Sequence, residues 1–517
     1  MPPLSWLFTL GLGFSTYLSV HAQDGGVTGP TTSIEAAGYS CDPSLCKLPD
    51  CNCASTSPPG GLAPADTPQF IVFTADDAIQ SYTLDVVNGF LAHRRNPNGC
   101  SPKMTYYTSL GYTNYTLVTD WYVAGNEIAD HTMTHQADPS PAEIDGNLVT
   151  LNSLAGIPFS SIQGFRAPYL NYSTSTLRHL YAAGFLYDSS ATSAIPVTDP
   201  RTDAFWPYTL DHGMANDCMS VDGLCKGQLR LKGFWEIPMY AFFDQLGQPH
   251  LMDPWLDLTN GATTPNDTAT AEYMRKTFTD HYNGNRQPIG LYTHPVHLST
   301  LPGLNVRNTT IPMINAFLDW AQGHDNVWIV STAQLLAWVR NPVPASALRS
   351  GSFKPFQCPT PNVDPSLKIC NGIPANEDGL LSHCSIGDGT FFTCYGCPVE
   401  QPTPQNPNPV QAPSSGSKLR LRVPANCSTP FWDPILGKCL CTSSECAFED
   451  VARPIGIDGV NITGGGTGGW DNTSAAGTSK YVPFNGNGAA SLHLVHFTLL
   501  VSVSILFTYL LNYNRWI

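Results

Sequence analysis

Between residue 69 and about residue 341, short apolar runs alternate with segments that space their apolar residues as one helix face does. The runs FIVFT, KMTYYTS, NEIAD, SIQGFRAPY, GFWEIPMY, PIGLYTHP and NVWIVS are strand-like in length and composition. The segments SYTLDVVNGFLAHR, PAEIDGNLVTLNSLAG, TSTLRHLYAAG and AQLLAWVR have helical spacing; Gly156 ends the second, and the last stops before Pro342. This alternation predicts an α/β barrel with parallel strands.

The run NEIAD leads into HTMTH, which places His131 and His135 four residues apart. On a helical turn these positions share one face, so both imidazoles could bind one metal ion. Two histidines leave a divalent ion without an anionic ligand, and Asp76 or Asp77, at the end of FIVFT, can supply it. The other carboxylate would then be free to act as a base.

Several polar residues stand at or just after the ends of predicted strands. They are Asp76, Asp77, His131, Arg166, Glu236 and His294. Sites in parallel α/β barrels form at the carboxyl ends of the strands. The sequence therefore predicts that these side chains meet at one mouth of the barrel.

Composition narrows the choice of partner. The net charge is -15, and only 13% of residues are charged, with no basic stripe to meet phosphates. A nucleic-acid partner is excluded on these grounds, and a neutral polysaccharide or wall surface fits better. With 517 residues the chain is long enough for one large catalytic domain and smaller modules.

The sixteen cysteines predict disulfides and an oxidising compartment. Cys218 and Cys225 flank a short loop and are expected to pair. Seven cysteines precede residue 342 and nine follow it, so at least one bridge joins the two parts or a thiol is left free. Seven Asn-x-Ser/Thr sequons predict N-glycans at Asn114, Asn171, Asn266, Asn308, Asn426, Asn461 and Asn472.

The ends of the chain predict secretion and attachment to the cell surface. Residues 1–22 read as a signal peptide. Residues 491–517 form an apolar tail that follows small residues, which predicts a glycosylphosphatidylinositol anchor in the outer membrane leaflet; a single membrane span is the alternative. Between the ends we expect a cysteine-rich N-terminal extension (23–66), a catalytic domain (67–341), a cysteine-rich module (342–446) and a Gly/Ser/Thr-rich stalk (447–490).

The ordered runs FTADDA, HTMTH, RAPY, FWEIP and LYTH resemble the polysaccharide deacetylases of carbohydrate esterase family four, and the chitin deacetylases in particular. The opening KLPDCNCASTSPPGGL is also similar to that of eukaryotic members. The resemblance implies a distorted (β/α) barrel of the polysaccharide deacetylase type, here with disulfide-rich N- and C-terminal extensions. It also implies a bound divalent metal ion, with zinc as the first expectation and cobalt as the second.

The resemblance implies roles for the motif residues. Asp77, His131 and His135 would bind the metal. Asp76 would be the general base, held by Arg166, and His294 would be the acid that protonates the leaving nitrogen.

The residues expected to contact the substrate match the family's pattern less closely than the metal ligands do. The resemblance implies that the backbone N–H of Tyr169 adds to an oxyanion hole and that Trp235 walls the acetyl pocket. The family's pocket leucine lies two residues before the acid histidine, where this chain has Tyr292 and places Leu291 before it. The family's acid histidine is usually tuned by a carboxylate. No Asp is recognisable in that role for His294, and Glu236 is the candidate. The usual Phe between Thr74 and the carboxylates is Ala75.

The expected function is metal-dependent removal of N-acetyl groups from N-acetylglucosamine residues of chitin or a related wall polysaccharide. A sugar O-acetyl esterase on the same scaffold and an inactive wall-binding protein are the alternatives. A ferrous oxygenase could use the same ligand types, but it predicts a pattern of hairpins that this chain lacks.

Overall fold

The computed structural model describes residues 38–358 apart from 219–220, 226, 259–261 and 305, and residues 382–412 apart from 387–388. It also describes the isolated positions 36, 420, 432–433, 438–439, 453, 455–456 and 462. The predicted signal peptide, the tail and almost all of the stalk lie outside these residues. Within them, no helix combines the length and the apolar character that crossing a membrane requires.

The centre of the described chain is a curled sheet of nine strands built around β1 (Gln69–Asp77). The strand β12 pairs with one edge of β1, and β13 and β2 pair with the first and second halves of the other edge, all in parallel. From β2 the sheet continues in parallel through β3, β4, β5 and β8, and β7 adds an antiparallel edge. The bounds are β2 Thr105–Thr108, β3 Glu127–Asp130, β4 Gly164–Phe165, β5 Tyr187–Asp188, β7 Tyr208–Thr209, β8 Trp235–Glu236, β12 Ile289–Thr293 and β13 Val327–Val330.

This arrangement confirms the predicted distorted barrel of parallel strands and adjacent helices. Among the described strand pairings, none joins β12 or β13 to β7 or β8, so hydrogen bonds leave the sheet open on one side. Four small pairs lie outside it: β6 (Thr192–Ser193) with β9 (Met239–Tyr240), β10 (Phe242–Phe243) with β11 (Pro249–His250), β14 (Ser382–Ile386) with β15 (Gly389–Thr393), and β16 (Trp432–Asp433) with β17 (Lys438–Cys439).

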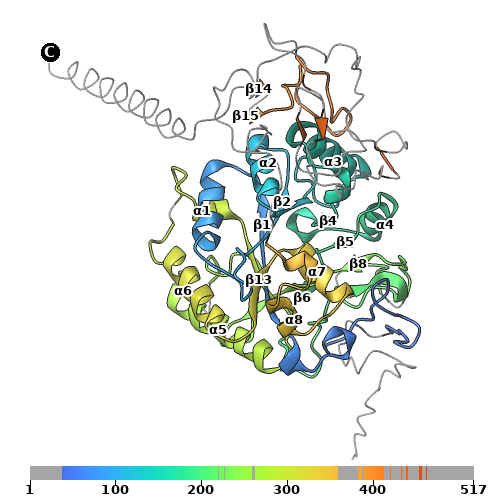
Figure 1. Cartoon of the computed structure of the whole chain (residues 1–517), viewed down its shortest axis with the longest axis vertical. Coiled ribbons are helices and arrows are strands. Elements are labelled where there is room, and N and C mark those ends of the chain that lie inside the picture. Colours follow the sequence, from blue (N-terminus) through green and yellow to red (C-terminus); the bar gives the residue numbers. More distant parts are fainter. Residues whose placement is uncertain are drawn as a thin grey trace, which may run out of the picture.

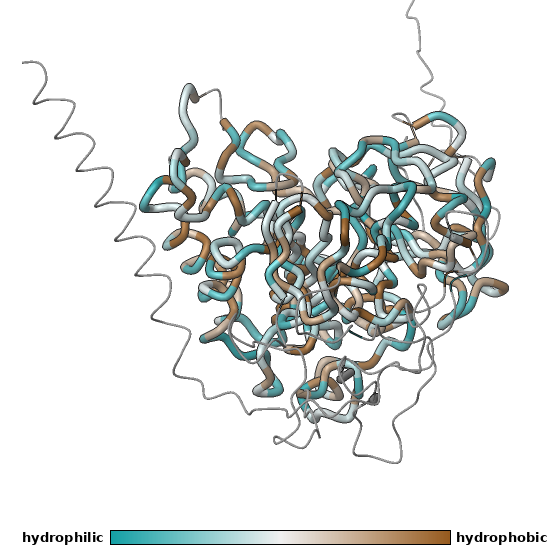
Figure 2. Tube along the Cα trace, turned by 90° about the horizontal axis from the view of Figure 1, so that it is seen from above, coloured by the Kyte–Doolittle hydropathy of each residue, from teal (hydrophilic) through white to brown (hydrophobic). Residues whose placement is uncertain are grey.

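Helices surround the sheet (Figure 1). They are α1 Ser81–Leu91, α2 Tyr115–Val123, α3 Pro141–Ala155, α4 Thr174–Ala182, α5 Asp267–Asn283, α6 Thr310–Gln322, α7 Thr332–Arg340 and α8 Ala345–Arg349. The four predicted helices are α1, α3, α4 and α7, whereas α2, α5, α6 and α8 were not expected. Gly156 ends α3 at φ 65°, as predicted. Figure 2 shows hydrophobic and hydrophilic stretches interspersed along the chain, as expected where each element has one buried and one exposed face.

The two faces of β1 pack against different cores. Ile71 and Phe73 belong to the large cluster shared with the outer helices. Phe70 and Val72 belong to a second cluster inside the curl, which includes Trp235 and side chains of α7. Successive side chains of a strand point to opposite faces, so the inward set of β1 continues to residues 74 and 76.

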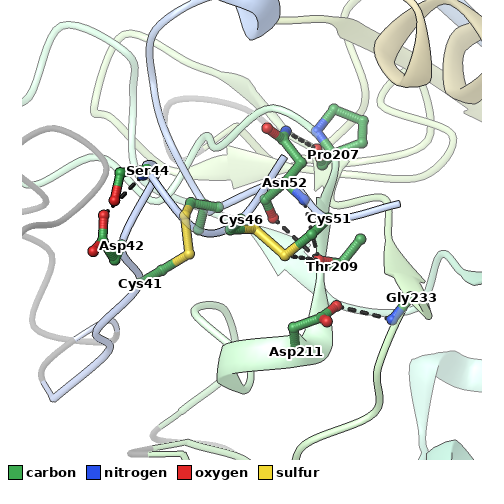
Figure 3. The surroundings of a disulfide bond; sticks show 12 residues. Cys41, Asp42, Ser44, Cys46, Cys51, Asn52, Pro207, Thr209, Asp211 and Gly233 are labelled. Carbon is green, nitrogen blue, oxygen red and sulfur yellow. Dashed lines mark hydrogen bonds between the residues drawn. A yellow bond between two sulfur atoms is a disulfide. The ribbon is translucent and has the colours of Figure 1, made fainter. Parts of the chain in front are cut away.

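Disulfides staple the extensions internally, and one of them joins distant parts of the chain. Cys41 pairs with Cys53 and Cys46 with Cys51 in the N-terminal extension, where the backbone N–H of Asn52 donates to Thr209 Oγ1 of β7 at 3.2 Å (Figure 3). The predicted bridge between Cys218 and Cys225 is present. Cys100 pairs with Cys358, which confirms that a bridge joins the two parts of the chain. Cys384 pairs with Cys397 beside β14 and β15.

Candidate metal and active site

Asp76 and Asp77 end β1 but point in different directions. Asp76 continues the inward set of the strand and is buried. Asp77 has φ 82°, a left-handed conformation that is rare outside glycine, and this breaks the alternation and carries its carboxylate to the rim. Burial alone would raise the pKa of Asp77, but His135 and the charges of His131 and His294 lower it to about 2. A strained turn therefore gives two adjacent carboxylates separate surroundings.

The histidine pair follows β3 in an irregular turn. The expectation that His131 and His135 share a helix face is wrong, because β3 ends at Asp130 and the next helix begins only at Pro141. Thr132 and His135 have φ 62° and 59°, so two left-handed residues fold the segment back and bring the rings within 5.1 Å. The pair converges by a turn that its spacing alone does not specify.

The residues at the rim fit a divalent metal. Asp77 Oδ1 lies 3.6 Å from His131 Nε2 and 3.2 Å from His135 Nε2. Tetrahedral ligands at about 2.1 Å from an ion stand about 3.4 Å apart, so these separations match such a site. The Nδ1 atom of His131 lies 2.8 Å from the carbonyl oxygen of Arg166, which leaves Nε2 toward Asp77. Burial lowers the pKa of His131 and so favours the neutral ring that binds metal.

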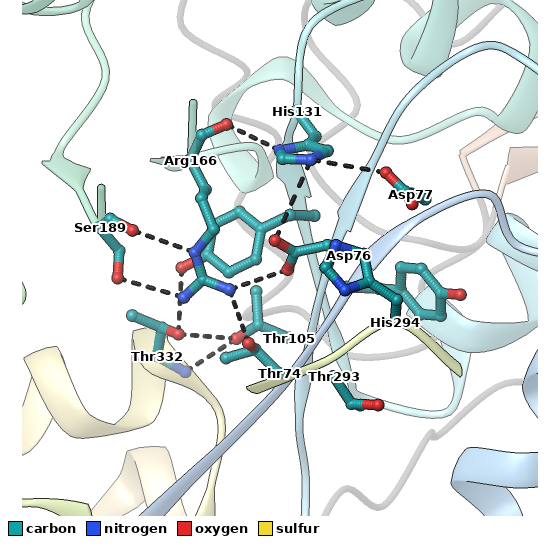
Figure 4. A network of polar contacts seen from close by, with 12 residues as sticks. Thr74, Asp76, Asp77, Thr105, His131, Arg166, Ser189, Thr293, His294 and Thr332 are labelled. Atoms are coloured by element: carbon teal, nitrogen blue, oxygen red, sulfur yellow. Dashed lines mark hydrogen bonds and ion pairs between the residues drawn. The ribbon is translucent and has the colours of Figure 1, made fainter. Parts of the chain in front are cut away.

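Arg166 holds Asp76 from inside the curl (Figure 4). Its Nη1 donates to Asp76 Oδ1 at 2.8 Å and to Thr74 Oγ1 at 2.7 Å, and its Nε donates to the Ser189 carbonyl at 3.0 Å. The guanidinium carbon lies 4.0 Å from the centre of the Tyr107 ring. Burial alone would lower the pKa of Arg166, but Asp76 raises it. The pairing expected from the resemblance is therefore present as a fully buried ion pair.

His294 follows β12, and its partner is a residue that the sequence did not reveal. The ring Nδ1 of His294 lies 2.5 Å from Asp253 Oδ2, and the backbone N–H of His294 donates to Asp253 Oδ1 at 3.0 Å. Burial alone would lower the pKa of His294, but Asp253, together with the charges of Asp76 and Asp77, raises it to about 9. Asp253 has no motif around it, and a backbone hydrogen bond from its N–H to the Tyr292 carbonyl places it beside β12.

The expectation that Glu236 tunes the pKa of His294 is wrong. Glu236 is buried in β8 beside Asp188, and the backbone N–H of Ala191 lies 3.4 Å from its Oε1. Trp235 points into the inner cluster, so its neighbour Glu236 points to the other face of the sheet, away from the mouth. A carboxylate at a regular strand end reaches the site if it stands on the inward face; one on the other face, like Glu236, would need a turn such as the one that redirects Asp77.

The expected substrate contacts fall in different places. Tyr169 has φ 57°, is 75% exposed and lies with its ring 4.7 Å from that of His135. Tyr292 is buried and faces Arg166 at 5.1 Å. Trp235 lies in the inner cluster, below the mouth, and Leu291 packs outward among the helices. We therefore leave Leu291 out of the proposed pocket, and any contact of Trp235 with substrate stays a prediction.

A cavity of about 570 Å³ opens beside the cluster. Asp76, Asp77 and His135 form one end of it. Its volume lies in the range of small-molecule and substrate sites, and its lining is largely apolar with a few convergent polar groups, which is the usual character of a binding site.

Comparison with known proteins gives the family. The chain is 32% identical over 378 residues to chitin deacetylase 8 of Bombyx mori, covering 71% of this chain and 92% of that protein. It is 31% identical over 396 residues to chitin deacetylase 1 of Bombyx mori, covering 71% of this chain and 68% of that protein. No protein-family model matches the chain.

Solved structures also match, with low scores. The family 4 carbohydrate esterase of Streptomyces lividans in complex with acetate has 16% identity and a TM-score of 0.26, covering 51% of this chain and 91% of that one. The chitin deacetylase of Colletotrichum lindemuthianum has 15% identity and a TM-score of 0.25, covering 54% and 92%.

The sequence relatives, and not these structural matches, carry the assignment. They place the chain among the polysaccharide deacetylases of carbohydrate esterase family four. Within that class the chain belongs to the chitin deacetylase family.

Proposed function

We propose that the chain is a metal-dependent deacetylase that removes N-acetyl groups from N-acetylglucosamine residues of chitin or a related wall polysaccharide and releases acetate. The observation that carries this proposal is the convergence, at one mouth, of a metal-type cluster, a buried carboxylate paired with Arg166, and a histidine paired with Asp253. The family relationship supports the substrate class.

Amide hydrolysis places three chemical requirements on the site. Water must lose a proton as its oxygen bonds to the carbonyl carbon, the developing oxyanion must be stabilised, and the nitrogen must gain a proton as the C–N bond breaks. A bound zinc or cobalt ion, held by Asp77, His131 and His135, would supply Lewis acidity and acidify water. The products are acetate and a free sugar amine.

Asp76 is the proposed general base. One oxygen, Oδ1, is occupied by Arg166 at 2.8 Å, and the other, Oδ2, lies 4.0 Å from His131 Nε2, on the side of the metal cluster. The carboxylate thus presents one fixed oxygen toward the place where water would be held. Because Arg166 is itself anchored to Thr74 and Ser189, this orientation does not depend on substrate.

His294 is the proposed general acid. Asp253 accepts from its Nδ1 side, so the proton available for the leaving nitrogen is on Nε2. The raised pKa of about 9 keeps the ring protonated at neutral pH, as an acid that must protonate an amine requires.

Tyr169 is proposed to contribute its backbone N–H to the oxyanion. It is the second residue of the short helical turn Pro168–Leu170, and the first N–H groups of a helical turn have no partner within it. The left-handed φ of 57° sets the direction of this peptide at the rim beside His135.

We also propose that the enzyme works outside the cell. The five disulfides among the described residues support an oxidising compartment. The signal peptide and the lipid anchor, which lie outside the described residues, remain predictions. Of the predicted glycan sites, Asn171, Asn266 and Asn308 are exposed.

The test is acetate release by the full chain from N-acetylglucosamine oligomers and from acetylxylan. We expect release from the oligomers, loss on treatment with chelator, and recovery on addition of zinc or cobalt. His294→Ala should remove most of the activity. His297→Ala is the matched control, since its ring lies 5.6 Å from that of His294 but is more exposed. Release from acetylxylan alone would replace the proposal with an O-acetyl esterase, and activity unaffected by chelator would refute the metal mechanism.

A further inference from the structure

The cavity beside the metal cluster extends well beyond the catalytic residues. Its other walls include the loop Ser109, Leu110, Gly111 and Tyr112, which begins beside Asp77, together with Leu301 and Gln401. A second cavity of about 190 Å³ shares Leu110, Gly111, Tyr112 and Gln401 with the first and reaches Thr390 and Phe391. Together they form one groove that runs from the cluster to residues 382–412, here called the hairpin module.

The hairpin module is fixed on the barrel rather than loosely appended. In Figure 1 its strands β14 and β15 lie beside α2. Phe391 packs on Tyr115 with ring centres 5.1 Å apart, the Phe392 N–H donates to Asn114 Oδ1 at 3.2 Å, and Thr393 Oγ1 donates to the Leu154 carbonyl at 2.5 Å. The bridge from Cys384 to Cys397 closes the module just before Gln401. Gln401 is therefore held at the groove by packing, hydrogen bonds and a disulfide.

Tyr112 stands in this groove as an exposed aromatic ring. Its side chain is 75% exposed, and its backbone has φ 60°, a left-handed conformation that tyrosine rarely adopts. The side chain of Gln80 hydrogen-bonds to its carbonyl oxygen, so the turn is held in place. A tyrosine kept on the surface by a strained turn loses the burial that normally stabilises the residue, and its apolar ring with a polar tip is suited to a ligand that is apolar on one face and polar at its edge.

The charge of the groove selects between kinds of polymer. Among the described residues, its lining includes Asp76 and Asp77 but neither lysine nor arginine. The whole chain carries a net charge of -15. An anionic polysaccharide would be repelled here, whereas an uncharged one would not.

We propose that this groove binds the sugar residues next to the one being deacetylated, with Tyr112 stacking on a pyranose face and Gln401 hydrogen-bonding to a hydroxyl or acetamido group. The hairpin module is then part of the substrate site of an uncharged N-acetylglucosamine polymer. This inference rests on the proposed function for the identity of the polymer.

The experiment compares Tyr112→Ala and Gln401→Ala with the natural chain on the N-acetylglucosamine dimer and pentamer. The expected result is a fall in the pentamer-to-dimer ratio of kcat/KM, by about tenfold for Tyr112→Ala and about fivefold for Gln401→Ala. The matched control is Tyr181→Ala, an exposed tyrosine of α4 that lines neither cavity, and it should leave the ratio unchanged. Thermal unfolding checks that each variant is folded.

Binding of the pentamer to the chelator-treated chain, measured by calorimetry, separates this inference from the proposed function. If the natural chain releases no acetate from either oligomer, the proposed function fails, and the binding comparison alone decides on the groove. Weaker pentamer binding by Tyr112→Ala than by Tyr181→Ala supports the groove. Equal binding, an unchanged kinetic ratio, or equal losses on dimer and pentamer would overturn it.

Discussion

Two pairs of buried groups in the curled sheet contrast with each other. At the mouth, Asp76 is paired with Arg166 at 2.8 Å, so burial is offset by an opposite charge. A few strands away, Asp188 and Glu236 lie side by side in β5 and β8, where Ser190 and Ala191 supply neutral donors. Burial raises the pKa of both carboxyls, and for Glu236 the charge of Asp188 raises it further.

The contrast shows how the carboxylate that we propose as the general base differs from one that is only buried. Asp76 and Glu236 both end parallel strands and are both buried. They differ in the face on which they stand and in the charge of the neighbour. Four substitutions test this comparison, from the largest expected effect to the smallest.

Asp76→Asn should lower kcat on N-acetylglucosamine oligomers by about 10²–10⁴, because an amide cannot accept the proton from water. Metal content, measured by elemental analysis, should stay that of the natural chain, since Asp77, His131 and His135 are intact. A variant that keeps its rate and its metal would show that Asp76 is not the base.

Arg166→Met should destabilise the chain by about 3–5 kcal/mol, because it leaves the buried charge of Asp76 without its partner. Denaturant unfolding measures the change. The double variant with Asp76→Asn should recover part of the lost stability, since the uncompensated charge is then gone. Additive losses in the double variant would contradict a dominant ion pair.

Asp253→Asn should lower the pKa of His294 from about 9 toward its ordinary value of 6.5, since Asp253 supplies the hydrogen bond and the nearest charge that raise it. The proposed acid would act in its protonated form, so activity should be lost as pH rises through this pKa. The alkaline limb of the kcat profile should therefore move to lower pH, with a rate loss of about tenfold or more at neutral pH. If the rate falls but the alkaline limb of the kcat profile stays at the same pH, Asp253 has only a structural role.

Glu236→Gln should have the smallest effect, about 1 kcal/mol or less, because the neutral amide resembles the protonated carboxyl that burial favours. A carboxyl whose folded pKa is raised binds more protons folded than unfolded, so its contribution to stability falls as pH rises above about 4.5. The variant lacks this decline and should gain relative stability between pH 5 and 8. Unfolding curves at the two pH values measure it.

The sequence by itself determined much of the sheet and the motif residues. Apolar runs of strand length and helical spacing locate β1, β3, β12, α1 and α7, and the order of the motifs locates the aspartates and histidines that meet at the mouth. These signals are local, because period and composition reflect the face that each segment buries. The odd cysteine counts likewise predicted either a bridge between the two parts of the chain or a free thiol, and the bridge from Cys100 to Cys358 is present.

Only the tertiary structure decided which strand-end groups lie together. Asp253 and His294 are 41 residues apart, and a backbone contact with β12 brings them together. Glu236 is excluded by the face it occupies, and Gln401 reaches the groove through a module packed on α2. Register, left-handed turns and packing between distant segments leave no periodic trace in the chain, so the partners of the motif residues emerge only when the sheet has curled.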